Sequence, residues 1–332
     1  MISIIDYGPY FAGARGALEG VAVDVAHACE NVGFFYALNH GVSDDTIDRA
    51  FAASRRCHAL PLEQKLALRL DDNNMGYLAI NPRYRAPRPC TSNPAESERE
   101  LFCHPRSRTG PSRRDRGEAV ARSQSVAAAA ARPACRHNGL FRRIARNVPP
   151  DAPALCRGAR PVPDYFAPYF ANEAHANLRF LHYPPQDTLE ENTFGQAPHI
   201  DNSFVTALAR TEVPGLAVRL PSGEWFAPPI LPGTFLINLG NIMRRWSNDR
   251  FLSTPHSVIN DSGTGRYSIA YFHTPNADAV IECDPTCTGA DNPPRYPPAV
   301  YRNLVLEFYR ASYFHQQGHQ YAAAERVVEA VP

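Results

Sequence analysis

The chain of 332 residues carries 34 basic and 33 acidic side chains, and 44% of its residues are hydrophobic. This length and composition support one large or two modest domains with a sizeable core. The net charge of +1 excludes nucleic-acid binding driven by the overall charge of the protein. The chain contains no run of eighteen apolar residues, so no membrane-spanning helix is expected. The eight cysteines form no CxxC pair and the first residues lack a signal-peptide pattern, which favours a cytoplasmic protein with reduced thiols. No obligate protein partner is evident.

The first hundred residues predict a small α/β layer. Residues 2–5 are rich in isoleucine and suit a short strand. Apolar residues recur at helical spacing over residues 14–30, and an aromatic-rich strand is expected over 33–38. Ser43 then offers a helix N-cap, with two aspartates in the first turn, and helical patterning runs on toward residue 60.

Residues 104–163 differ sharply from the rest of the chain. They hold thirteen arginines and three acids, a net charge of +10, while the remainder carries −9. Three interpretations stay open: a basic arm for an anionic partner, a disordered insert, or an out-of-frame translation of GC-rich DNA. A single lysine against thirty-three arginines points to a GC-rich source.

The second half of the chain has the sequence pattern of an antiparallel β fold. Helical patterning returns only in a closing helix predicted over residues 299–315. Short strands without helices between most of them favour a sandwich or jelly roll over a parallel sheet. The predicted strands cover residues 178–183, 197–208, 215–220, 224–226, 234–239, 256–259 and 266–272, with the third and fourth forming a hairpin.

The triplet His199-Ile200-Asp201 is the first candidate for chemistry. On a strand, residues two apart project to the same face, so His199 and Asp201 can reach one point. An HxD triplet alone is a weak signal, but His256 begins another predicted strand. Two imidazoles and one carboxylate that leave positions open form the ligand set of mononuclear non-haem Fe(II) oxygenases. A closed zinc site would need a fourth protein ligand, and none is evident.

Arg266 and Ser268 form a second candidate pair. By strand alternation they share one face, with Tyr267 on the other. A guanidinium is a planar two-pronged donor and the serine hydroxyl adds a third hydrogen bond, so the pair suits a carboxylate. The alternative is that Arg266 forms an ordinary ion pair at the surface. This alternative is disfavoured because Arg266 occurs in the same sequence as the three metal-ligand candidates and follows His256 by ten residues.

These stretches together resemble the isopenicillin N synthase-like branch of the 2-oxoglutarate- and Fe(II)-dependent oxygenases. The resemblance covers about residues 1–102 and 164–315. It is carried by Ser3-Ile4-Ile5-Asp6, Gly33-Phe34-Phe35-Tyr36, Asn39-His40-Gly41, Leu178–Pro185, His199-Ile200-Asp201, Pro232-Gly233-Thr234-Phe235, Asn238-Leu239-Gly240, Arg245-Trp246-Ser247-Asn248-Asp249, Ser253-Thr254-Pro255-His256 and Arg266-Tyr267-Ser268.

The resemblance implies a mainly β fold with an α/β N-terminal layer and a double-stranded β-helix (jelly roll) core flanked by helices. It implies His199, Asp201 and His256 as iron ligands. It divides the chain into an N-terminal α/β region (1–102), an anomalous segment (103–163) and a catalytic core with a C-terminal helix (164–332).

The resemblance also implies a cosubstrate site. Arg266, Ser268 and Tyr183 would bind the distal carboxylate of 2-oxoglutarate. Many relatives carry an asparagine two residues before that tyrosine, where this chain has Leu181, so one cosubstrate contact is expected to be missing or replaced.

By resemblance, the expected activity is that of a 2-oxoglutarate-dependent dioxygenase using Fe(II), 2-oxoglutarate and O₂. Decarboxylation to succinate would drive hydroxylation, desaturation or cyclisation of a small-molecule substrate. The alternatives are an isopenicillin N synthase-like oxidase that does not use 2-oxoglutarate, an ethylene-forming type of enzyme, and an inactive remnant if residues 104–163 are miscoded.

Overall fold

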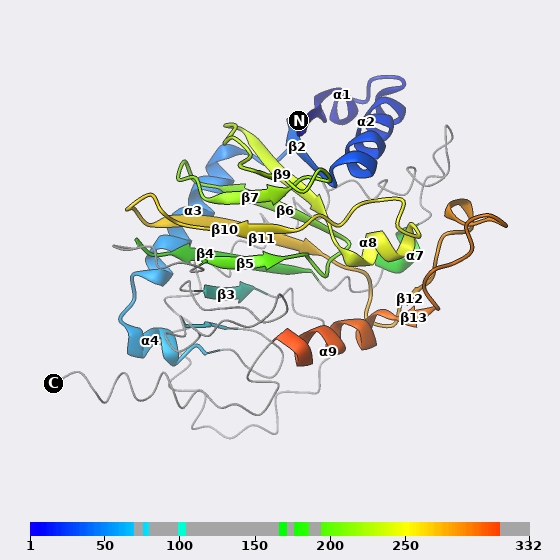
Figure 1. The fold of residues 1–332 in the computed structure, drawn as a ribbon. Helices are drawn as coiled ribbons and strands as arrows, with labels where there is room; N and C mark the ends of the chain where they lie inside the picture. Colours follow the sequence, from blue (N-terminus) through cyan, green and yellow to red (C-terminus); the bar gives the residue numbers. More distant parts are fainter. Residues whose placement is uncertain (70–75, 80–98, 104–165, 171–175, 186–193, 313–332) are drawn as a thin grey trace.

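The computed structural model describes residues 1–69, 76–79, 99–103, 166–170, 176–185 and 194–312. Two facing β-sheets form a jelly roll, with helices packed around it (Figure 1). The predicted fold class is confirmed. The anomalous segment, apart from Cys103, lies outside the described residues, and so do the last three residues of the predicted closing helix.

The larger sheet has seven strands, and it joins the N-terminal part of the chain to the core. Only its first two strands pair in parallel; the other pairs are antiparallel. In spatial order the strands are β1 (Ser3–Asp6), β2 (Phe34–Leu38), β9 (Thr234–Leu239), β6 (Val205–Arg210), β11 (Arg266–His273), β4 (Asn177–Tyr183) and β3 (Arg99–Cys103).

The smaller sheet consists of β5 (Gln196–His199), β10 (His256–Val258), β7 (Leu216–Arg219) and β8 (Trp225–Phe226), in that order. The predicted hairpin is confirmed as β7 and β8. A further pair, β12 (Val280–Ile281) with β13 (Ala299–Val300), was not predicted.

The helices cover the outside of the barrel (Figure 1). Among them, α2 and α3 match the two helices predicted for the N-terminal part. The helices are α1 (Gly8–Phe11), α2 (Ala17–Asn31), α3 (Asp44–His58), α4 (Leu62–Leu66), α7 (Ala167–Phe170), α8 (Asn241–Trp246) and α9 (Tyr301–Ser312), with a 3₁₀ turn, η2, at Pro285–Cys287.

Side-chain alternation in the larger sheet separates a helix-facing side from the barrel interior. In β6, Val205, Ala207 and Ala209 pack into the main hydrophobic cluster with residues of the helices. The intervening Leu208 packs against a second cluster, which includes Tyr183. Residues 206, 208 and 210 therefore point into the space between the two sheets.

One predicted strand is wrong in extent. Residues 197–208 form β5 and β6 with a turn between them, so Asp201 lies beyond the end of β5. The turn is held from a distant part of the chain: the amide of Asn241, at the start of α8, donates to the carbonyl of Asp201 at 2.7 Å. Gly240 permits this approach, because a Cβ there would lie 2.1 Å from the carbonyl oxygen of Ser203.

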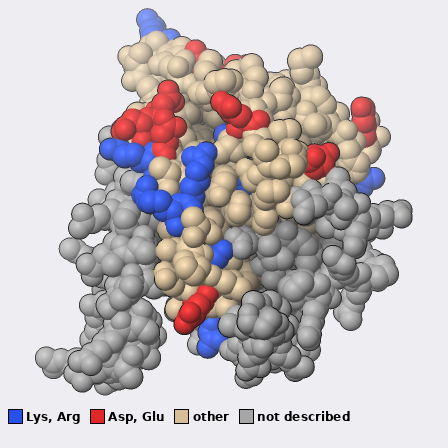
Figure 2. Space-filling model, turned by 90° about the vertical axis from the view of Figure 1, so that its left-hand side faces the viewer, with Lys and Arg blue, Asp and Glu red and all other residues tan. Residues whose placement is uncertain are grey.

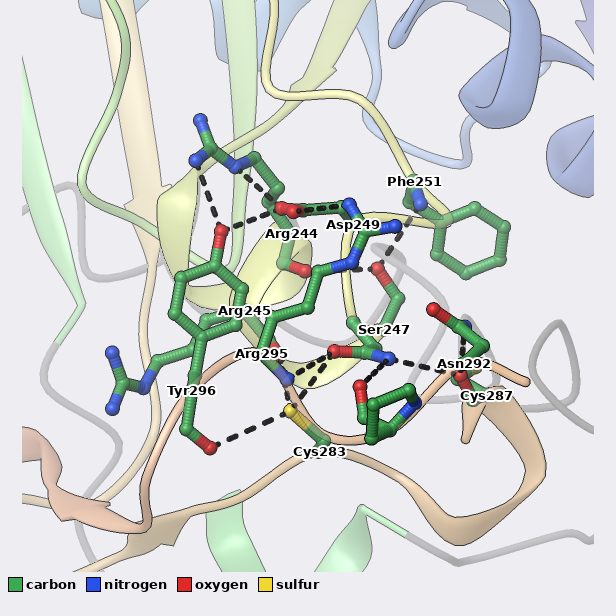
Figure 3. Close-up of polar contacts among 12 residues, drawn as sticks. Arg244, Arg245, Ser247, Asp249, Phe251, Cys283, Cys287, Asn292, Arg295 and Tyr296 are labelled. Carbon is green, nitrogen blue, oxygen red and sulfur yellow. Dashed lines mark hydrogen bonds and ion pairs between the residues drawn. The ribbon is translucent and has the colours of Figure 1, made fainter. Parts of the chain in front are cut away.

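The turn after α8 is fastened to the excursion that contains β12, η2 and β13 (Figure 3). Asp249 accepts hydrogen bonds from the Tyr296 hydroxyl at 2.6 Å, Arg244 at 2.9 Å and Arg295 at 3.1 Å. The buried Asn248 amide donates to the carbonyls of Cys287 and Pro293. This network fixes α8, whose first amides hold the Asp201 turn.

On the face shown in Figure 2, Lys and Arg side chains gather in a patch that acidic side chains border. This mixed pattern fits the near-neutral net charge of the chain. Within the described ranges, the helices are too short or too polar for any of them to span a bilayer.

Candidate active site

Three predicted residues meet at one end of the barrel interior. His199 ends β5 and His256 begins β10, and the two are direct cross-strand partners with ring centroids 4.3 Å apart. Asp201 Oδ1 lies 3.7 Å from the Nε2 atom of each histidine. The potential ligand atoms of the three residues all lie within 4.8 Å of one another, close enough for a single ion to contact all three.

Backbone carbonyls orient both imidazoles. His199 Nδ1 lies 2.8 Å from the carbonyl oxygen of Ala197, and His256 Nδ1 lies 3.2 Å from that of Thr254. A carbonyl oxygen only accepts, so each Nδ1 carries a hydrogen and each Nε2 is the ring nitrogen that faces Asp201. Metal-binding histidines are commonly oriented in this way.

The other carboxylate oxygen of Asp201 is held by two donors. Thr206 Oγ1 and Asn238 Nδ2 each donate to Oδ2 at 2.7 Å, and all three side chains are buried. Burial by itself raises the pKa of Asp201, but positive charge on the histidines and these two hydrogen bonds outweigh it and hold the pKa below its ordinary value. Asp201 is therefore ionised and presents Oδ1 to the histidines.

Sequence reasoning did not single out Thr206 or Asn238 for this role. The signal was present, because each polar residue has apolar neighbours on both sides in its strand, Val205–Arg210 or Thr234–Leu239. Buried polar side chains in such strands need partners, and here both find the same carboxylate oxygen.

Arg266, Ser268 and Tyr183 also lie together. Arg266 is 1% exposed and pairs in register with Tyr183 on β4, with its guanidinium carbon 4.8 Å from the centre of the tyrosine ring. Ser268 is equally buried, two residues along β11. Burial lowers the pKa of Arg266, and the neighbouring Tyr183 partly opposes this. Among the described residues, Arg266 Nε and Nη1 have no hydrogen-bond partner.

Leu181 occupies the position where many relatives carry an asparagine. It pairs in register with Ser268 and packs against the hydrophobic cluster of the barrel interior. Tyr183 is confined on its other side by Gly195, where a Cβ would lie 2.7 Å from the ring. The buried guanidinium of Arg266 therefore lies beside the Tyr183 ring, with the apolar side chain of Leu181 on the neighbouring strand.

Two family models match two separate parts of the chain. The model of the non-haem dioxygenase in morphine synthesis N-terminal region matches residues 2–100, and that of the 2OG-Fe(II) oxygenase superfamily matches residues 174–275, which contain all six predicted site residues. The chain belongs to the 2OG-Fe(II) oxygenase superfamily. The family prediction made from the motifs is confirmed.

Curated relatives of this oxygenase match along almost their whole length. The 2-oxoglutarate-Fe(II) type oxidoreductase hxnY of Emericella nidulans is 29% identical over 97% of this chain and 93% of its own. A 2-oxoglutarate-Fe(II) type oxidoreductase of Aspergillus fumigatus is 29% identical over 98% and 97%. The protein is an Fe(II)- and 2-oxoglutarate-dependent oxidoreductase with O₂ as the co-oxidant, and the alternative activities are not favoured.

Solved structures share the fold of this oxygenase. A 2OG-Fe(II) oxygenase family protein of Caulobacter crescentus aligns with a TM-score of 0.73 at 22% identity, covering 93% of this chain and 98% of that one. A full-length protein of Neurospora crassa, solved in complex with alpha-KG, aligns with a TM-score of 0.71 at 23% identity over 93% and 96%.

Proposed function

We propose that His199, Asp201 and His256 hold the Fe(II) of this oxygenase. The observation that carries the proposal is the convergence of two imidazole nitrogens and one carboxylate oxygen within 4.8 Å of one another. This donor set is that of the mononuclear non-haem iron oxygenases, which leaves coordination positions for ligands from outside the protein. No fourth protein ligand joins the group among the described residues.

In this proposal Arg266, Ser268 and Tyr183 bind the distal carboxylate of 2-oxoglutarate. A guanidinium that is almost fully buried, and that has two nitrogens with no hydrogen-bond partner in the described part of the chain, is costly unless an anion joins it. A carboxylate fits a guanidinium fork in a bidentate manner. The Ser268 hydroxyl, buried on the same face of β11, is positioned to add a third hydrogen bond.

The chain's own residues bind, orient and shield the reactants. When bound, Fe(II) and 2-oxoglutarate would activate O₂, which is the oxidant: oxidation of 2-oxoglutarate to succinate and CO₂ takes up one oxygen atom and leaves the other for oxidation of the substrate. The ionised Asp201 offsets part of the metal charge, and the carbonyl-anchored histidines keep their Nε2 atoms directed inward. Phe34, whose ring meets that of His256 edge-on at 5.5 Å, supplies an apolar wall that excludes water from one side.

The primary substrate is proposed to be a small molecule that undergoes hydroxylation, desaturation or cyclisation. Several relatives are named for oxidation of a small molecule, among them homoarginine-6-hydroxylases and a gibberellin 2-beta-dioxygenase. The Neurospora crassa protein mentioned above was also solved in complex with thymine, another small molecule. A cytoplasmic location remains a prediction, which accords with the buried free thiols of Cys29, Cys57, Cys283 and Cys287. The division at residues 102 and 163 also remains a prediction.

Two measurements on the full-length protein test this function. Without oxygen, Fe(II) plus 2-oxoglutarate should give a weak visible charge-transfer band; with oxygen, succinate should form. Both signals should disappear in His199→Ala and persist in His27→Ala, a control on the exposed side of α2. Full succinate formation by His199→Ala would refute the ligand assignment. Oxygen uptake without succinate in the wild type would instead favour the oxidase.

A further inference from the structure

A second arginine lies beside the pocket of Arg266. Arg210, the last residue of β6, is the direct cross-strand partner of Ser268 on β11. It shares its strand face with Leu208, which packs into the barrel interior. Directly opposed residues on neighbouring strands have Cβ atoms about 4.5–5.5 Å apart, so Arg210 adjoins the serine of the pocket.

The immediate surroundings of Arg210 fix its guanidinium in place. Nη1 donates to the carbonyl of Pro228 at 3.0 Å and Nη2 to that of Pro229 at 2.8 Å. The guanidinium carbon also lies 5.7 Å from the ring centre of Tyr36, whose hydroxyl donates to the same Pro229 carbonyl. All of these partners are neutral, so they hold the cation without cancelling its charge.

The charge of Arg210 acts on the guanidinium of Arg266. Burial lowers the pKa of Arg210, and burial together with the nearby charge of Arg210 lowers that of Arg266. Over the ranges that the structure describes, neither arginine forms an ion pair with a carboxylate. Two neighbouring like charges, one buried on Arg266 and one half-buried on Arg210, repel each other and favour a negatively charged ligand.

We infer that Arg210 is a second cationic determinant of the cosubstrate pocket, which makes this oxygenase select an α-keto acid with a distal carboxylate over one with an uncharged end. The inference rests on the proposed role of Arg266 and Ser268. It assigns Arg210 an electrostatic role in the pocket in addition to bracing the Pro228–Pro229 segment.

Binding without turnover tests the inference. The probes are 2-oxoglutarate and 2-oxovalerate, which has the same number of carbons but a methyl group in place of the distal carboxylate. Dissociation constants are measured by calorimetry on the Fe(II)-loaded, oxygen-free protein. We expect Arg210→Gln to raise the Kd for 2-oxoglutarate by about tenfold or more and to leave that for 2-oxovalerate within about twofold. Arg210→Lys, which keeps the charge, should restore most of the affinity.

The controls separate the inference from the proposed function. Arg219→Gln removes an exposed arginine from β7 and should change neither constant. Arg266→Gln should weaken 2-oxoglutarate binding strongly. If Arg266→Gln does so and Arg210→Gln does not, the inference fails while the proposed function stands. Equal weakening of both keto acids in Arg210→Gln would assign Arg210 a bracing role only. If Arg266→Gln also leaves 2-oxoglutarate binding intact, the proposed cosubstrate site itself is wrong.

Discussion

The two hydrogen bonds to Asp201 Oδ2 make a quantitative prediction about metal binding. Thr206→Val keeps the shape of the side chain and removes one of the two donors at 2.7 Å. A hydrogen bond to a charged group contributes about 1.5–3 kcal/mol, which corresponds to about a tenfold to hundredfold change in an equilibrium constant. Loss of a group that orients a metal ligand typically costs about the same factor in affinity. The Kd for Fe(II) should therefore rise by about 10- to 100-fold.

The assay is anaerobic titration of the metal-free protein with Fe(II) in competition with a chromophoric chelator. Thr234→Val is the matched control, because Thr234 also donates from Oγ1 at 2.7 Å, but to the carbonyl of Leu231, at the opposite end of β9 from Asn238. Asn238→Leu should resemble Thr206→Val, and the double variant should be non-additive, because both donors act on one oxygen. If Thr206→Val and Thr234→Val bind Fe(II) equally well, the orienting role of Thr206 is refuted.

Three further predictions concern stability. Burial raises the pKa of Asp249, but hydrogen bonds from one tyrosine and two arginines outweigh it and hold the pKa below its ordinary value. A lowered pKa stabilises the fold above the unfolded pKa of about 3.9, and the benefit is lost as the pH falls through the folded pKa. Asp249→Asn should therefore cost about 1–2 kcal/mol at pH 7, and in urea unfolding its deficit should shrink below about pH 4; a deficit independent of pH would contradict this cause. Gly240→Ala should lower Tm and weaken Fe(II) binding, because its Cβ would push the Ser203 backbone; an unchanged Tm would show that the turn can move freely. Gly20→Ala, where a Cβ meets nothing within 4 Å inside α2, should stabilise the protein by about 0.5–1 kcal/mol, and a loss of stability would show an unseen constraint.

The sequence was most informative where one periodicity governs an element. Alternation in Arg266–His273 correctly placed Arg266 and Ser268 on one face. Apart from β5 and β6, which were predicted as one strand, the strands from β4 to β11 were found within a few residues. The turn at 202–204 was missed although a local signal was present, since the polar residues Asn202 and Ser203 follow Asp201 directly. The long-range contact that anchors this turn, the amide of Asn241 on the carbonyl of Asp201, is encoded by no local pattern.

The same limit applies to the site. The triad was predicted from residue type and resemblance, and the structure brings its members together although Asp201 is not on a strand. The role of Arg210 could not be predicted, because it depends on the register of β6 against β11. The pairing of β12 with β13 was missed because each strand has two residues, too few for any periodicity to appear.

Iron-edge anomalous diffraction from crystals of the full-length protein, grown with Fe(II) under anaerobic conditions, tests the proposed iron site most directly. We expect one strong peak in contact with Nε2 of His199, Nε2 of His256 and Oδ1 of Asp201, while Oδ2 stays hydrogen-bonded to Thr206 and Asn238. A peak at any other position, or one that lacks His256 as a ligand, would contradict it.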